Sequence, residues 1–249
     1  MKPISERLFW LTEKLPPRLR DWTPIRAVRD KLRVREIVRR TAPLVASPRF
    51  AKRIAERGFK VVFVSPIFNS YPLLVHSLRA QTYENWELLL VHDGTAEGLD
   101  DASRRAIASD HRIHFYETDS RANDWGHTPR QFAFEKLRLV EDCDFVVVTN
   151  SDNYHVPGFT EKMLERFDES SKVVFCDMVH DYYSWRHFET RLEYSFIDCG
   201  CLMTRYQAAM AVGWRDRGYA GDWEYVRDLM DKFGREAFRK LAAPLFVHN

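Results

Sequence analysis

The chain has few of the features that mark several large classes of protein. Its 249 residues include four cysteines and no Cys-x-x-Cys pair, so a zinc site has weak support and reduced thiols are expected. No apolar run approaches the roughly 20 residues that a membrane-spanning helix needs. The first residues also lack the apolar core and cleavage site of a secretory signal. We therefore expect a cytoplasmic protein, with any membrane association on the cytoplasmic face.

Glycine-rich phosphate-binding loops are also absent. No G-x-G-x-x-G run follows a predicted strand, which counts against a dinucleotide-binding Rossmann domain. A nucleotidyltransferase would be expected to carry a glycine-rich basic loop, and none occurs here. No recognised nucleic-acid-binding module is present, so we expect no nucleic-acid partner.

Positive charge is concentrated towards the N-terminus. Residues 1–58 hold 16 Lys and Arg against 6 Asp and Glu, whereas residues 59–249 hold 22 against 30. The first segment contains no strand-like run, and two or three short helices are predicted there. This basic arm can lie on an anionic membrane surface, pack on its own acidic body, or join a second subunit. The sequence leaves these alternatives open.

The most informative stretch runs from residue 144 to residue 152. Residues 145–149 are apolar or β-branched, which is typical of a strand buried on both faces in a parallel sheet flanked by helices. The chain then turns polar at Asn150, Ser151 and Asp152. A carboxylate at the C-terminal end of a central strand lies where open α/β sheets bind ligands. A polar strand end followed by an Asx turn is the plainer alternative.

Strands and helices alternate on both sides of this stretch. Strands are predicted over residues 60–66, 87–91, 113–116 and 172–178, and helices near residues 72–80, 100–108, 127–139, 158–169 and from 221 onward. The alternation predicts an α/β domain over residues 59–249, with a mostly parallel central sheet flanked by helices.

The first two strand ends resemble the opening of the family 2 glycosyltransferases of GT-A fold. The residues that carry the resemblance are Val64-Ser65-Pro66, Leu78, Gln81, Tyr83, Trp86-Glu87 and Val91-His92-Asp93-Gly94-Thr95. That family moves a sugar from a nucleotide-diphospho-sugar to a hydroxyl acceptor. The family usually has two acidic residues before this glycine, and His92 stands in place of the first.

The resemblance implies a nucleotide site at these strand ends. Pro66 would line the base pocket, and Asp93 would accept hydrogen bonds from the base or ribose. Arg130 opens a predicted helix, where free N–H groups and the helix dipole favour an anion, so it is a candidate for the diphosphate. His127 beside it is either a second functional residue or a structural one.

The resemblance also implies a metal site. Residues 150–152 match the family's Asp-x-Asp motif, with Asn150 replacing the first Asp. Asp152 would be the direct ligand of Mn²⁺ or Mg²⁺, while Asn150 and Ser151 would contact the nucleotide. Such a cation neutralises charge that gathers on a departing diphosphate. His248, near the end of the chain, is the second candidate ligand.

A third motif implies the catalytic base. Residues 220–224 resemble the family's Glu-Asp motif, with Gly221 replacing the Glu. Asp222 would remove the acceptor's proton in an inverting transfer, although it could also cap the helix. Glu224 is the second choice. Gly200, within a small-residue strand, would let the donor sugar approach the backbone closely.

The sequence leaves alternatives open for the acceptor and for the type of function. Aromatic residues between positions 181 and 196 are candidates for an acceptor site or for a loop that covers the core. The expected partners are the sugar donor, a glycan or lipid-linked acceptor in polysaccharide synthesis, and a membrane or second subunit at the arm. Because Asn150 and Gly221 replace carboxylates, a non-catalytic sugar-nucleotide-binding module is an alternative, as is a nucleotidyltransferase-like enzyme.

Overall fold

A computed structural model of the chain describes residues 58–69, 72–180, 186–215 and 218–248, together with Lys14, Val28 and Leu32. Most of the predicted basic arm therefore lies outside the described residues. Its helices, and the domain boundary before residue 59, stay predictions. Among the described residues, no helix combines the length and the apolar character needed to span a bilayer.

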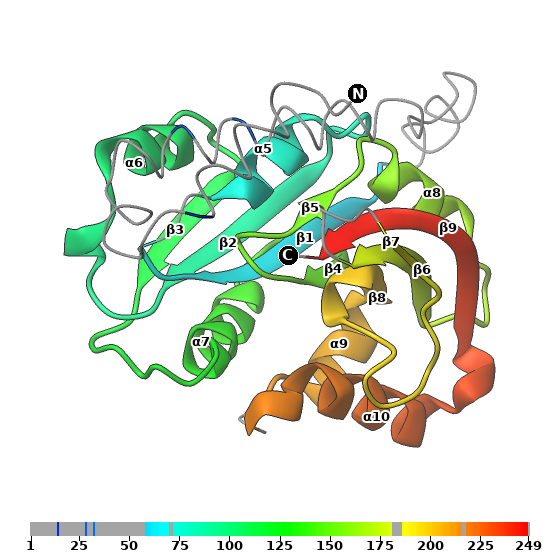
Figure 1. Ribbon diagram of the computed structural model, residues 1–249. Helices are drawn as coiled ribbons and strands as arrows, with labels where there is room; N and C mark the ends of the chain where they lie inside the picture. Colours follow the sequence, from blue (N-terminus) through cyan, green and yellow to red (C-terminus); the bar gives the residue numbers. More distant parts are fainter. Residues whose placement is uncertain are drawn as a thin grey trace.

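Strands and helices alternate through most of this body (Figure 1). The strands are β1 (Lys60–Ile67), β2 (Trp86–His92), β3 (Ile113–Glu117), β4 (Cys143–Val148), β5 (Tyr154–His155), β6 (Val173–His180), β7 (Arg186–Phe188), β8 (Leu202–Arg205) and β9 (Phe238–His248). The α-helices are α5 (Leu73–Arg79), α6 (Asp101–Ala108), α7 (His127–Leu137), α8 (Phe159–Glu165), α9 (Tyr206–Val212) and α10 (Gly221–Phe233). Short 3₁₀ helices are η2 (Ala96–Gly98), η3 (Cys199–Cys201), η4 (Gly218–Ala220) and η5 (Arg235–Ala237).

The described strands form one sheet in the order β3-β2-β1-β4-β8-β6-β9-β5, with β7 paired to β6. The pairs β1–β2, β1–β4, β2–β3 and β6–β9 are parallel and contain most of the paired residues. The shorter ladders β4–β8, β6–β8, β6–β7 and β5–β9 are antiparallel. Helices α5 and α6 lie on one side of the sheet and α7, α9 and α10 on the other (Figure 1).

The register of the parallel strands brings their ends to one edge. Ile67 pairs with His92, and His92 pairs with Glu117. Val64 of β1 pairs with Val148, the last residue of β4. The segments that follow these four strands therefore start at the same edge of the sheet, where α/β folds bind ligands.

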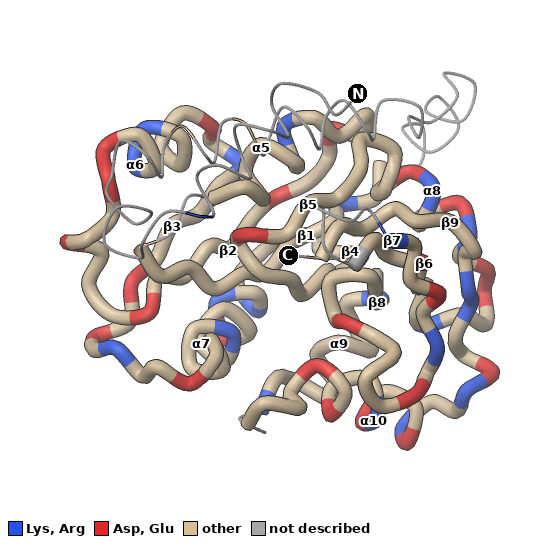
Figure 2. Tube along the Cα trace, in the orientation of Figure 1, with Lys and Arg blue, Asp and Glu red and all other residues tan. Residues whose placement is uncertain are grey.

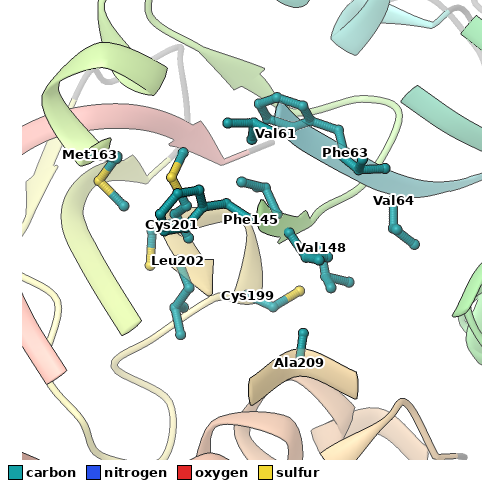
Figure 3. Close-up of a cluster of buried hydrophobic side chains, with 14 of the residues drawn as sticks. Val61, Phe63, Val64, Phe145, Val148, Met163, Cys199, Cys201, Leu202 and Ala209 are labelled. Atoms are coloured by element: carbon teal, nitrogen blue, oxygen red, sulfur yellow. The ribbon is translucent and has the colours of Figure 1, made fainter. Parts of the chain in front are cut away.

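The central strands are buried on both faces, as their composition predicts. Figure 3 shows part of this core, with side chains from β1, β4, η3 and α9 packed together, among them Val61, Phe63, Phe145, Cys201 and Ala209. Each fully buried Val or Phe side chain among them stabilises the fold by roughly 1.5–3 kcal/mol. Charged residues are few on β1, β2 and β4 and lie mainly on the flanking helices and outer connections (Figure 2).

The strand β9 is not predicted from the sequence pattern. Pro244 interrupts the run, and a proline cannot donate a ladder hydrogen bond. In the structure Pro244 pairs with Asp177 where the register of β6 and β9 shifts. Such an irregularity tolerates the missing donor, and β9 then carries His248 towards the strand-end edge.

Candidate active site

Two cavities lie at this edge. The first, which we call the strand-end cavity, has a volume of about 450 Å³, and the second, the α10 cavity, about 460 Å³. The strand-end cavity is bounded by the segments that follow β1, β2, β3 and β4, and the α10 cavity by the start of α10 and the end of β9. Trp125 and Asn150 line both, so the two cavities adjoin.

The structure gathers most of the predicted site residues around these cavities. The strand-end cavity is lined by Pro66, Asp93, Asn150, Ser151 and Asp152. The α10 cavity is lined by Arg130, Asn150, Asp222 and His248.

Glu224 and Gly200 line neither of the two cavities. Glu224 forms an ion pair with Arg227 on the same helix. Gly200 is buried, and a Cβ on it would meet Phe246 and Thr149. Close packing within the core therefore accounts for a glycine at position 200.

Asp93 connects the nucleotide-side residues to the loop before α7. Its two carboxylate oxygens accept hydrogen bonds from the backbone N–H groups of Ala122 and Asn123, at 2.8 and 3.0 Å. Gly126 ends this loop with φ +82°, and a Cβ there would lie 2.7 Å from Cγ of Pro66. The loop is thus fixed against both β1 and β2.

Arg130 is a buried cation between the two cavities. Its Nη1 donates to the carbonyl oxygen of Trp125 at 3.0 Å, and its Nη2 donates to Oδ1 of Asn150. The guanidinium carbon lies 4.9 Å from the ring centroid of Trp214. Within the described part of the chain, Nε has no hydrogen-bond partner. Arg130 therefore offers positive charge to an anion in the α10 cavity, which it lines.

An acidic cluster contributes to the lining of the α10 cavity. The Cys199 thiol donates to Oδ1 of Asp222 at 3.0 Å, and Oδ1 of Asp198 accepts from the backbone N–H of Gly200 at 2.7 Å. Nε2 of His248 is 3.4 Å from Oδ2 of Asp198. Burial, and then the charge of Asp222, raises the pKa of Asp198 well above the usual range. The same two causes raise the pKa of the Cys199 thiol, so it remains a donor.

This cluster contains a functional candidate that sequence reasoning missed. Asp198 is not among the residues predicted from the sequence, although it lies two residues before Gly200, which the family resemblance implies for the donor sugar. Trp125 and Tyr219 were also not selected, and both line the α10 cavity. Each lies beside a motif residue, which is the signal that could have found them. The predicted aromatic segment contributes Phe188 and Tyr194 to the same lining; residues 181–185 lie outside the described residues.

Some side chains of this cluster, but not all, are ligands that a hard divalent cation prefers. Among the described residues, Asp198, Cys199 and Asp222 form one group whose ligand atoms all lie within 4.8 Å of one another. Mg²⁺ and Mn²⁺ prefer carboxylate oxygens, which Asp198 and Asp222 offer. A protonated thiol is a poor ligand for such ions, so Cys199 does not fit. Asp152 offers a further carboxylate on the adjoining strand-end cavity.

Comparison with known proteins identifies the type of domain. The family model described as Glycosyl transferase family 2 matches residues 63–214. EpsH of Bacillus subtilis strain 168, which is assigned as a glycosyltransferase, is 25% identical over 108 residues. These residues are 43% of this chain and 29% of EpsH, so the match spans less than a third of that protein.

Three solved structures share the fold. The mannosyltransferase PcManGT from Pyrobaculum calidifontis, in complex with GDP-Man and Mn²⁺, has a TM-score of 0.56 and 18% identity, over 76% of this chain and 56% of that one. Glucosyl-3-phosphoglycerate synthase from Mycobacterium tuberculosis, in complex with Mn²⁺, UDP and glucosyl-3-phosphoglycerate, has a TM-score of 0.53 and 15% identity, over 79% and 74%. Mannosyl-3-phosphoglycerate synthase from Rubrobacter xylanophilus has a TM-score of 0.56 and 15% identity, over 80% and 70%. These likenesses confirm the predicted GT-A fold class.

Proposed function

The chain belongs to glycosyl transferase family 2, since that family's model covers more than half of its residues, and we propose that it transfers a hexosyl group from a nucleotide-diphospho-sugar to a hydroxyl acceptor with inversion. The observation that carries the proposal is the contact between the two cavities. Residues proposed for the donor and the residue proposed as base line adjoining spaces that share Trp125 and Asn150. One substrate can therefore extend from the strand ends to Asp222.

In this proposal the strand-end cavity holds the nucleotide. Pro66 lines the base pocket, and Asp93 accepts from the base or ribose with the lone pairs that Ala122 and Asn123 leave available. Arg130 and Asn150, which hydrogen-bond each other between the cavities, meet the diphosphate. The backbone of Ser151 is fixed by a hydrogen bond, in which its carbonyl oxygen accepts from the backbone N–H of Leu74 at 2.9 Å. Glu224 and Gly200 have supporting roles at most.

Asp222 is the proposed general base. It removes the proton from the acceptor hydroxyl while that oxygen bonds to the anomeric carbon of the donor. The bond from this carbon to the diphosphate breaks on the opposite face, and the diphosphate leaves with the electron pair. The Cys199 thiol donates to Oδ1 of Asp222, and the carboxyl group of Asp198 also lies within hydrogen-bonding reach of Asp222. Both neighbours hold Asp222 in place for the acceptor hydroxyl.

A divalent cation, Mn²⁺ or Mg²⁺, fits the carboxylates of this cleft. Asp152 would hold it from the strand-end cavity, and His248 with Asp198, whose Oδ2 lies 3.4 Å from Nε2 of His248, from the α10 cavity. Among the described residues, the ligand atoms that already lie together are those of Asp198, Cys199 and Asp222. When bound, such a cation supplies positive charge to a departing diphosphate. The presence of Mn²⁺ in two of the structures of similar fold supports this choice.

The acceptor side of the proposal is a glycan or a lipid-linked sugar. The basic segment of residues 1–58 would bring the enzyme to a membrane surface or to a second copy of the chain, on the cytoplasmic side. Comparing vesicle binding of the full chain at low and high salt tests the membrane contact, because salt screens such attraction.

The donor is tested by thermal unfolding of the full chain with UDP-, GDP-, CMP- and dTDP-sugars, each with and without Mn²⁺. A ligand that binds only the folded state raises the melting temperature. We expect one nucleotide class to do so, more strongly with the metal, and we expect that sugar nucleotide to be turned over. Binding without turnover would favour the non-catalytic binding module. Turnover of a nucleoside triphosphate and a sugar phosphate would favour a nucleotidyltransferase. Failure of every sugar nucleotide to bind would contradict the proposal.

A further inference from the structure

Exposed aromatic side chains gather at the α10 cavity. Among the described residues, six large apolar side chains are exposed, namely Val28, Phe68, Trp125, Leu139, Tyr194 and Tyr219. Three of the six line the α10 cavity: Trp125 is 68% exposed, Tyr194 58% and Tyr219 85%. Exposed apolar side chains are ordinary when they are scattered singly, but a group around one cavity points to a binding surface.

Two of these rings come from separate parts of the chain and meet. Trp125 lies in the loop before α7, and Tyr219 lies in η4. Their ring centroids are 6.5 Å apart, with the planes at 80°. The edge of one ring therefore meets the face of the other, and both rings line a cavity whose lining also includes the proposed base, Asp222.

The loop that presents Trp125 is fixed in a strained conformation. Asn123 and Trp125 have φ of 54° and 56°, a region that a bulky side chain rarely adopts. Hydrogen bonds to Asp93 and from Arg130 hold this loop in place. Strain of this kind persists where the surroundings fix it, and it is concentrated at ligand sites.

The charges around the cavity select the class of ligand. Its carboxylates, Asp198 and Asp222, can accept hydrogen bonds from hydroxyl groups. Among the described lining residues, Arg130 is the only Lys or Arg, and in the proposed function it meets the diphosphate of the donor. An acceptor with a phosphate or carboxylate group would meet aromatic rings and carboxylates here. A neutral sugar ring has an apolar C–H face that suits the negative face of an aromatic ring and hydroxyls that suit the carboxylates.

We infer that Trp125 and Tyr219 form an acceptor subsite for a neutral sugar ring, so that the acceptor is the sugar end of a glycan or glycoside and not a small anionic molecule. This inference rests on the proposed function, which it narrows. Trp125 also lines the strand-end cavity, so its replacement would disturb the donor too. Of the two cavities, Tyr219 lines only the α10 cavity. Because its side chain is largely exposed, we expect its replacement to leave the fold intact.

The test uses the full chain and three variants, Tyr219→Ala, Tyr219→Phe and Leu139→Ala. Leu139 is also exposed but lines neither cavity, so its variant is the matched control. The probes are methyl glycosides of glucose, galactose, mannose and N-acetylglucosamine, with 3-phosphoglycerate as the anionic acceptor. Release of nucleoside diphosphate is measured with and without each probe, using the sugar nucleotide that stabilises the protein.

We expect at least one neutral glycoside to accelerate release. Tyr219→Ala should raise the KM for that glycoside about tenfold, the scale of one lost stacking contact. Tyr219→Phe should retain an acceptor KM near that of the wild type. The control Leu139→Ala should match the wild type in acceptor KM, in donor KM and in the slow transfer of the sugar to water. The inference is overturned if only 3-phosphoglycerate accelerates the release of nucleoside diphosphate. It is also overturned if no probe accelerates this release while the enzyme still transfers the sugar to water. An unchanged acceptor KM in Tyr219→Ala also overturns it.

A binding measurement separates this inference from the proposed function. Saturation-transfer NMR with the same methyl glycosides requires no turnover, and it reports which sugar protons contact the protein. We expect saturation on the ring C–H protons with wild type and Tyr219→Phe, and its loss with Tyr219→Ala. If no sugar nucleotide is bound or turned over but this pattern is found, the proposed transferase fails and the sugar subsite stands. If no glycoside shows saturation with the wild type, or if Tyr219→Ala retains it, the subsite is refuted whatever the donor result.

Discussion

The imidazole of His127 fills the space beside Gly221. A Cβ built on Gly221 would lie less than 3.0 Å from Cε1 of His127, closer than real Cβ atoms approach their neighbours. The ring is held at both nitrogens, because Nδ1 accepts from Nε1 of Trp214 at 3.1 Å and Nε2 donates to the carbonyl of Gly218 at 2.8 Å. A histidine from α7 thus supports the start of α10, at the position where the family motif usually has a carboxylate.

This relationship predicts coupling between two substitutions. Gly221→Ala alone should destabilise the fold by about 1–3 kcal/mol, because the new methyl group overlaps the imidazole. In His127→Ala that overlap disappears, so the double variant should be more stable than the sum of the single changes predicts. Urea unfolding of the four proteins measures the difference. His127→Ala combined with the distant Leu139→Ala is the control and should be additive; strict additivity of the Gly221 pair would contradict the packing.

The thiol of Cys199 predicts a graded effect on catalysis. It donates to Asp222, so Cys199→Ala removes a hydrogen bond to the proposed base and should lower kcat about fivefold. Cys199→Ser retains a donor and should stay within about threefold of wild type. Steady-state kinetics with the selected donor checks both variants. Equal losses in the two would show that the hydrogen bond has no part in the effect.

Arg130 predicts an effect on donor affinity. A lysine cannot retain the two separate Nη contacts, to the Trp125 carbonyl and to Asn150, that the planar guanidinium makes. Arg130→Lys should therefore weaken binding of the nucleotide sugar about tenfold or more, as measured by titration calorimetry. Arg138→Lys, at the exposed end of the same helix, is the matched control. Unchanged affinity in Arg130→Lys would remove Arg130 from the donor site.

His155 predicts how stability depends on pH. Complete burial among Phe63, Phe159 and Phe246 lowers its pKa to about 4 from an ordinary value of 6.5. The unfolded chain therefore binds a proton that the folded chain does not, between these two values. The neutral ring's contribution is complete above pH 6.5 and is lost as the pH falls towards 4, by about 3 kcal/mol in all.

The variant His155→Phe separates this effect from other acid-sensitive groups. It loses the hydrogen bond from Nε2 to the Gly200 carbonyl, so it should be less stable than wild type at pH 7. Its further loss of stability between pH 7 and pH 4 should be smaller than that of wild type, by about 3 kcal/mol. Urea unfolding across this pH range measures the free energy of unfolding of both proteins. If this free energy falls in parallel with pH in the two proteins, the assignment to His155 is contradicted.

The sequence predicts residues that the sheet brings together at the strand-end cavity, and for a physical reason. Asp93 and Asp152 each follow a short apolar run that is typical of a buried strand, and parallel strands bring their ends to one edge. The registry of β1 with β2 and β4 then places both carboxylates on one cavity. Local pattern and the geometry of a parallel sheet are enough for this step.

The α10 part of the site depends on contacts between distant segments of the chain, which a local sequence pattern cannot predict. The approach of Asp198 to Asp222 requires the segment at η3 to pack beside α10. The contact of Trp125 with Tyr219 requires two segments from distant parts of the chain to meet. The position of His248 depends on β9, whose pattern Pro244 interrupts. These residues were therefore found from the structure, except where the family resemblance had already indicated Asp222 and His248.

The central claim is that Asp222 removes the acceptor's proton in a cleft that binds a nucleotide-diphospho-sugar. Its most direct test compares Asp222→Asn with wild type at saturating donor, acceptor and Mn²⁺. The account predicts that kcat falls about 10²–10⁴-fold while the donor Kd, measured by calorimetry on the same samples, stays within about twofold. A variant that retains the full kcat with every acceptor used by the wild type would contradict it.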